Sequence, residues 1–110
     1  MAYDEELAHR VREVVQGQQG LTEQRMFGGL AFLINGNMAV AASGQGGLLL
    51  RVDPARTSEL LDPPLVRRFE MRGRQLDGWL RIEDQALTGE PEFRHWVDTG
   101  VSYARSLPAK

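Results

Sequence analysis

The side chains that could catalyse a reaction or bind a metal are few in this 110-residue sequence. It has no cysteine, which excludes disulfides, thiol catalysis and cysteine-ligated zinc or iron–sulfur centres. Its two histidines, His9 and His95, do not form a His-x-x-x-His pair, the spacing that places two ligands on one helix face. We therefore expect no metal site.

Nucleophilic catalysis and nucleotide binding also lack their usual motifs. No serine stands in the Gly-x-Ser-x-Gly turn that exposes a nucleophile. Residues 44–47 are Gly-Gln-Gly-Gly, but a predicted strand follows them instead of the Lys-Ser/Thr and the helix of a phosphate-binding loop. We expect a protein that is not an enzyme and that holds no cofactor, with a small-molecule-binding domain as a further alternative.

Two groups of residues remain as candidate binding surfaces, and the first is rich in arginine. Residues 67–81 contain five arginines and two acidic residues, so this segment carries +3 in a chain of net charge −2. Guanidinium groups beside Trp79 could bind phosphate or stack on a base, or the segment could be a solvated hairpin with Trp79 in the core. The predicted nucleic-acid patch consists of Arg67, Arg68, Arg72, Arg74, Trp79 and Arg81.

The second candidate surface is a hairpin, formed by residues 26–34 and 38–42, that is apolar on both faces. A sheet covered by helices on one side should carry polar residues on the other. An apolar face is either covered within the chain or buried against a second protein, and we expect a homodimer or partner interface here. The predicted interface residues are Phe27, Gly29, Ala31, Leu33, Ala39 and Ala41.

Capping and turn residues delimit the elements that carry these surfaces. Asp4 can cap a first helix that ends near Gly17, and Asn35-Gly36 predicts a type I′ hairpin turn. Asp53-Pro54 predicts the start of a short helix, and Asp77-Gly78 predicts the turn of a second hairpin.

The last helix is the clearest, because apolar residues recur at 3.6-residue spacing over residues 93–107, after a cap at Thr88 or Gly89. The element order is therefore α-β-β-β-α-β-β-α. Short connections between the strands favour antiparallel pairing. We expect a single domain over residues 1–110 of the α+β class, with a two-layer fold, a mainly antiparallel five-stranded sheet and helices on one face.

Targeting signals are not evident in the sequence. Residues 1–6 are acidic, unlike the basic start of a signal peptide. The longest nearly apolar run, residues 26–34, is far shorter than the ~20 residues that span a bilayer. We expect a cytoplasmic protein without a membrane partner.

Several segments closely resemble the N-terminal domain of the TfoX/Sxy family of bacterial competence regulators. The most specific is Arg-Met-Phe-Gly-Gly-Leu-Ala-Phe at residues 25–32, followed by Asn-Gly-Asn-Met at residues 35–38. Further matching segments are residues 50–52, 78–79, 96–97 and 103–108. The resemblance covers nearly the entire chain, and it implies a fold similar to secretion chaperones and no known enzymatic activity.

Long members of that family join this domain to a C-terminal helical domain and co-regulate transcription of DNA-uptake genes together with the cyclic-AMP receptor protein. This sequence ends at Lys110 and is similar to standalone members without the C-terminal domain. The leading hypothesis is a non-enzymatic protein-interaction or regulatory module of uncharacterised role that acts through the open face of the sheet or its exposed strand edge. Transcription or competence regulation is what the resemblance implies. Weak nucleic-acid binding through residues 67–81 is the alternative hypothesis.

Overall fold

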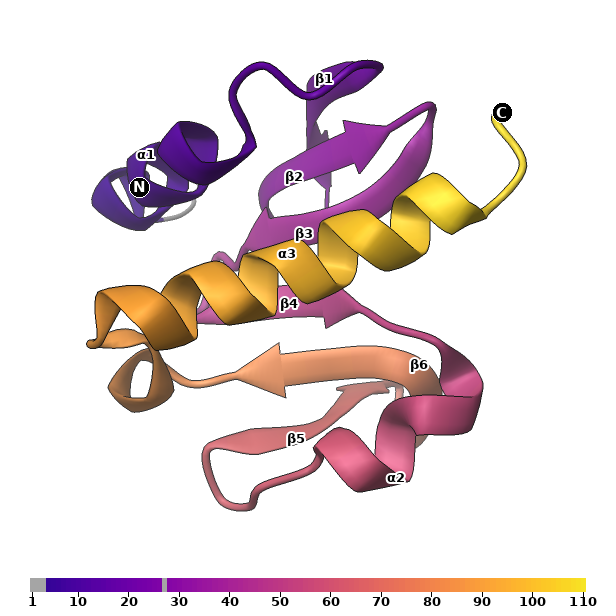
Figure 1. Cartoon of the computed structure of the whole chain (residues 1–110). Coiled ribbons are helices and arrows are strands. Elements are labelled where there is room, and N and C mark those ends of the chain that lie inside the picture. The colour runs from indigo at the N-terminus through magenta and orange to yellow at the C-terminus, as the bar shows by residue number, and fades with distance from the viewer. Residues whose placement is uncertain (1–3, 27) are drawn as a thin grey trace.

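The computed structural model describes residues 4–26 and 28–110, and Figure 1 labels its elements. Its helices are α1 (Glu5–Val15), α2 (Thr57–Leu60) and α3 (Glu90–Ser106), with two short 3-10 helices, η1 (Pro54–Arg56) and η2 (Asp84–Leu87). Its strands are β1 (Leu21–Met26), β2 (Gly29–Ile34), β3 (Asn37–Ala42), β4 (Leu48–Arg51), β5 (Val66–Met71) and β6 (Arg74–Ile82). Within these described ranges, no helix is long and apolar enough to cross a membrane.

All six strands form one antiparallel sheet in the order β1-β2-β3-β4-β6-β5. Helices α1 and α3 lie side by side over one face of it, and α2 lies near β6 (Figure 1). The α+β class with two layers is therefore confirmed. The predicted strand number of five is wrong, because β1 is a sixth strand.

The strand that the sequence did not reveal, β1, lies at the edge of the sheet. Only its end residues, Leu21 and Met26, are partly buried, and the four residues between them are exposed. An edge strand with no layer over it does not need the alternation of apolar and polar residues that signals a strand. The apolar run 26–34 is consequently divided, with Met26 ending β1 and Gly29 beginning β2.

Residues in the left-handed backbone region make the tight turns. Asn35 and Gly36 have φ angles of 52° and 85°, as the predicted type I′ turn requires. The second hairpin turns at Arg72 and Gly73, whose φ angles are 54° and 77°. The prediction of a turn at residues 77–78 is therefore wrong.

Asp77 and Gly78 lie instead inside β6, where the pairing with β5 is interrupted between Arg68 and Phe69. At this bulge the backbone N–H of Gly78 donates to the Thr57 hydroxyl at 2.7 Å. Thr57 is buried and donates in turn to the carbonyl of Pro54 at 2.9 Å. The bulge thus attaches β6 to the segment that begins α2, a long-range contact that turn residues alone do not indicate.

The main core lies between the sheet and the helices. Asp4 caps α1 as predicted, because its carboxylate accepts a hydrogen bond from the backbone N–H of Leu7 at 3.1 Å. The long helix α3 starts after Gly89, the second of the two predicted caps. Its buried side faces β3 and β4, and its buried residues are Phe93, Val97, Gly100, Val101 and Ala104.

A second, smaller core lies on the face of the sheet that the helices do not cover. We call it the outer cluster; it consists of Ala31, Leu33, Met38, Ala41 and Leu49. Met26, Phe69 and Trp79 pack against it and are themselves partly buried. Both faces of the central strands are therefore apolar, in agreement with the sequence of the first hairpin.

An ion pair connects α1 to β1 and supports a prediction about pH. Arg12 donates two hydrogen bonds to the carboxylate of Glu23, at 2.7 and 2.9 Å. This hydrogen bonding lowers the pKa of Glu23, partial burial opposes the effect, and the charge of Arg12 adds to it. A lowered pKa in the folded state stabilises the fold above the ordinary pKa of about 4.3, and the stabilisation is lost as the pH falls through the lowered value.

We expect Glu23→Gln to lower the free energy of unfolding by less than ~1 kcal/mol at pH 7, because both side chains are partly exposed. Urea unfolding at pH 7 and near pH 3 measures the effect. Wild type and variant should differ at the higher pH and converge at the lower one. An equal difference at both pH values would show that the charge of Glu23 does not contribute.

Candidate functional site

Three residues of the predicted protein interface lie in the outer cluster. Ala31, Leu33 and Ala41 are 0%, 8% and 2% exposed, so the chain itself buries them. Phe27, also predicted for this interface, lies outside the described residues.

The other two predicted interface residues contact different parts of the fold. Ala39 packs in the main core on the helix side. A bulge in the β2–β3 pairing, between Phe32 and Leu33, shifts the alternation along β3, so Ala39 and Ala41 do not share a face. The placement of all six residues on one face is therefore wrong at Ala39. Gly29 is buried against β3, where an added Cβ would overlap the carbonyl oxygen of Ala42.

The outer cluster is covered by the sheet itself. Met26 of β1 and Phe69 of β5 come from strands at opposite ends of the strand order, yet both line one small cavity of about 110 Å³ with Ala41 and Leu49. The sheet must therefore curl toward this side, bringing its edge strands over its own centre. The apolar surface that motivated the interface prediction is thus buried without a second protein.

The structure divides the predicted nucleic-acid patch into separate groups. Arg67 and Arg81 both pair with Glu83, and Arg81 lies 3.3 Å from this carboxylate. Arg81 also donates to the Ser43 hydroxyl and to the Gln45 carbonyl, at 3.2 Å each. This arginine therefore holds the loop between β3 and β4 in place.

Arg68 is bound elsewhere, donating to Asp77 at 2.8 Å and to the Ser58 hydroxyl at 2.9 Å. Trp79 is half-buried beside the outer cluster, and the guanidinium of Arg51 lies 5.2 Å from the centre of its ring.

The hairpin tip carries the remaining two arginines of the predicted patch. Arg72 and Arg74 are exposed, and they make no ion pair in the part of the chain that the structure describes. Two unpaired arginines are a smaller basic surface than the five that the sequence places together.

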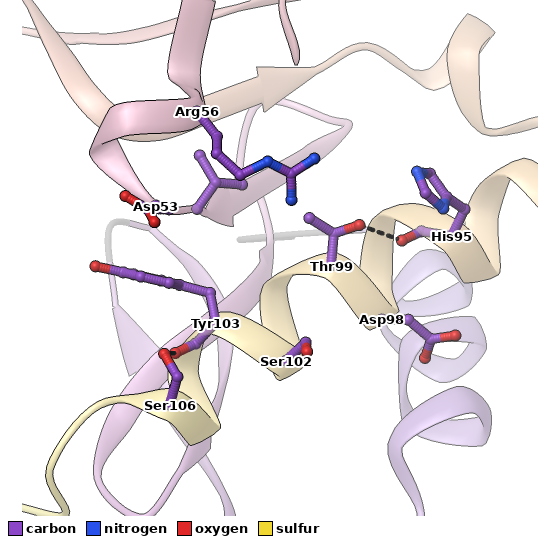
Figure 2. A pocket seen from close by; sticks show the side chains of 9 residues that line it. Asp53, Arg56, His95, Asp98, Thr99, Ser102, Tyr103 and Ser106 are labelled. Carbon is purple, nitrogen blue, oxygen red and sulfur yellow. Dashed lines mark hydrogen bonds between the residues drawn. The ribbon is translucent and has the colours of Figure 1, made fainter. Parts of the chain in front are cut away.

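A different surface is hollowed and polar, and it lies beside α3. One hollow of about 430 Å³ opens between η1 and the C-terminal half of α3. Figure 2 shows Arg56 extending from the η1 side toward Thr99 and His95, and the ring of Tyr103 lying near Asp53. The hollow therefore joins two segments that are far apart in the sequence.

A second hollow, of about 450 Å³, lies at the N-terminal half of α3. Its lining is more apolar and includes Trp96, Pro91, Ala86 and Val66. His95 lines both hollows, so together they run along one side of α3. We call this combined surface the α3 groove.

The two aromatic rings of the α3 groove contact other groups of the fold: the rings of Trp96 and His95 lie 5.8 Å apart, and the guanidinium of Arg51 lies 5.9 Å from the centre of the Tyr103 ring. The hydroxyl of Thr99 donates to the carbonyl of His95 at 2.7 Å, and the hydroxyl of Ser106 donates to the carbonyl of Tyr103 at 2.6 Å. These bonds hold the hydroxyls on the helix backbone and do not assemble a nucleophile with a base. Across the described ranges, no three His, Asp or Glu side chains are grouped to hold a metal ion.

The sequence contains one signal for this groove, next to the apolar stripe of the last helix. Trp96, Thr99, Tyr103 and Ser106 follow one another at offsets of 3, 4 and 3 residues, which is the spacing of a second stripe. The opposite wall, η1 and Arg56, could not be assigned to the groove from the sequence, because only the tertiary fold brings it to α3.

Two segments that carry the family resemblance meet near the C-terminal end of α3. The carbonyl of Asn35 accepts a hydrogen bond from the backbone N–H of Lys110 at 2.8 Å. The side-chain amide of Asn37 donates to the carbonyl of Pro108 at 3.0 Å. Two hydrogen bonds therefore link the first hairpin to the residues after α3.

Residues 13–104 match the family model described as the TfoX N-terminal domain. No curated protein and no solved structure matches the chain. The family match spans most of the sequence, from within α1 to the last turns of α3. The chain belongs to the TfoX N-terminal domain family.

Proposed function

We propose that this domain is a non-enzymatic protein-interaction module with a regulatory role, and that it binds its partner through the α3 groove. The observation that carries the proposal is that Trp96, Tyr103 and Arg56 line one groove. Tryptophan, tyrosine and arginine are the residue types most enriched among those that dominate binding energy at protein interfaces.

The partial burial of the two aromatic side chains supports this role. Trp96 packs against the main core while it lines the groove, and Tyr103 is likewise half-buried. A side chain already held by the fold loses little conformational freedom when a partner covers the rest of its surface. The groove therefore offers preorganised contact area.

Nucleic-acid binding through residues 67–81 is the alternative proposal. It is supported by Arg72 and Arg74 at the exposed tip of the β5–β6 hairpin. Its support is smaller than that of the groove, because the ion pairs of Arg67, Arg68 and Arg81 with acidic side chains reduce the local positive charge.

The test compares three forms of the purified protein: wild type, a Trp96→Ala/Tyr103→Ala double variant, and Met71→Ala as the matched control. Met71 is an exposed large apolar residue, 37% accessible, and it does not line the α3 groove. Proteins retained from native cell extract are identified and purified, and their affinity for each form is measured by calorimetry. Thermal unfolding establishes that each variant is folded.

We expect a retained partner to bind the double variant at least about 30-fold more weakly than wild type, the loss that follows from removing hot-spot aromatic side chains. The Met71→Ala control should bind as wild type does. A folded double variant with unchanged affinity would overturn the assignment of the groove.

A further inference from the structure

The lining of the α3 groove contains more carboxylates than guanidinium groups. Asp53 and Asp98 line one hollow, and Asp62 and Glu92 line the other. The single lining guanidinium, Arg56, lies 3.2 Å from the carboxylate of Glu59. Four carboxylates and one guanidinium give the lining a formal charge of −3, which is more negative than the −2 of the whole chain.

The residues outside the lining therefore sum to a formal charge of +1, and the guanidinium of Arg51, 5.9 Å from the centre of the Tyr103 ring, is the nearby cation that the lining count leaves out. Carboxylates on the rim of a groove attract cationic segments and repel acidic ones and nucleic-acid phosphates. This charge distribution selects among possible partners before any specific contact forms.

The apolar part of the groove adds a second requirement. Trp96, Pro91 and Ala86 line the hollow that also carries Asp62 and Glu92. An apolar side chain placed there would be covered by the tryptophan ring while cationic neighbours reach the two carboxylates. A ligand with charged groups but no apolar side chain would leave this apolar surface exposed to water.

The length of the groove limits how much of a partner it can hold. The lining residues of α3 run from Pro91 to Ser106, and at about 1.5 Å rise per residue this is roughly 22 Å. An extended chain advances about 3.3 Å per residue, so roughly seven residues fit along the groove.

We propose, resting on the proposed function of the groove, that its occupant is an extended segment of a partner protein, about seven residues long, with lysine or arginine residues flanking an apolar anchor. The apolar anchor occupies the hollow beside Trp96. The cationic side chains face Asp62 and Glu92 at this hollow, and Asp98 farther along α3.

The experiment selects ligands from a displayed library of random seven-residue peptides against wild-type protein. Each selected peptide is then synthesised and measured by fluorescence anisotropy against three variants. The variants are Asp62→Asn/Glu92→Gln, which removes two groove charges, Trp96→Ala, and Glu13→Gln as a control. Glu13 is an exposed carboxylate on α1 that does not line the groove.

We expect the selected peptides to be enriched in lysine or arginine around an aliphatic or aromatic residue. Their affinity should fall about tenfold in Asp62→Asn/Glu92→Gln at low salt, because two charge pairs between the peptide and the groove are lost. Raising the salt concentration should weaken binding to wild type more than to this variant. Glu13→Gln should bind as wild type does.

Two contrary results are distinguishable. Neutral or acidic peptides that lose affinity in Trp96→Ala would overturn the basic partner and leave the groove as a binding site. Peptides that bind Trp96→Ala as well as wild type, or the absence of any saturable peptide, would overturn both the basic partner and the groove.

Discussion

Replacing Phe93 by alanine is expected to lower the free energy of unfolding by about 3–5 kcal/mol. Phe93 is fully buried near the start of α3, and the guanidinium of Arg10 on α1 lies 4.1 Å from the centre of its ring. Removing the ring leaves a cavity where α3 meets the main core, and it also removes the aromatic surface beside Arg10. Urea unfolding followed by tryptophan fluorescence measures this loss.

The matched control for Phe93→Ala is Met71→Ala. Both positions are apolar in the sequence, but Met71 is 37% exposed at the end of β5, and its replacement should change stability by less than ~0.5 kcal/mol. If the two substitutions had equal effects, Phe93 could not be a central residue of the core.

Replacing Gly100 by leucine is expected to destabilise the protein by about 3 kcal/mol or more, because overpacking adds volume that the interface cannot accept. An added Cβ at Gly100 would lie 2.5 Å from the carbonyl oxygen of Ala39 and 2.6 Å from a methyl group of Leu50. The first of these atoms belongs to the backbone of β3 and cannot move alone. Accommodation would require α3 to move away from the sheet.

Ser102→Leu provides the control in the same helix, two residues away and exposed. Leucine has a better helix propensity than either glycine or serine, so propensity favours both variants. We expect Gly100→Leu to lower the midpoint of thermal unfolding by more than 10 °C, since about 1 kcal/mol corresponds to 4–8 °C in a domain near this size. Ser102→Leu should leave it nearly unchanged, and a similar midpoint for both variants would exclude close packing at Gly100.

Local chemistry made several parts of the fold predictable. The cap at Asp4 and the type I′ turn at Asn35-Gly36 depend on residues that are neighbours in the chain, and both are confirmed. The last helix is confirmed as well, because one apolar stripe over four turns is specific to the 3.6-residue period. Each of these features can be predicted without knowing what the element packs against.

The sequence-based predictions are wrong where a contact between distant residues determines the local structure. Asp77-Gly78 has the composition of a turn, but Gly78 lies in a bulge of β6. There it has a positive φ, and its backbone N–H donates a hydrogen bond to the Thr57 hydroxyl. The strand β1 carries no apolar alternation, because it is an edge with exposed side chains. Ala39 packs in the main core and not on the face predicted for it, because a bulge in the β2–β3 pairing changes which side chains of β3 point to the helices.

The distribution of charged side chains likewise depends on contacts between residues that are distant in the sequence. The five arginines of residues 67–81 are close in sequence, yet Glu83, outside that segment, pairs with Arg67 and Arg81. The α3 groove has the opposite origin, because its carboxylates come from residues 53, 62, 92 and 98 and form one surface only in the folded chain. A count of charge along a sequence therefore does not identify a charged surface.

The sequence by itself determined the family, the α+β class and the scarcity of catalytic side chains, because these depend on residue types and their local order. It also showed that the central hairpin is apolar on both faces. Only the tertiary structure decided what covers those faces. Helices cover one, and the curled sheet covers the other with Met26 and Phe69. The curl and the wall of the α3 groove that η1 and Arg56 form both result from packing between distant segments, which no local pattern specifies.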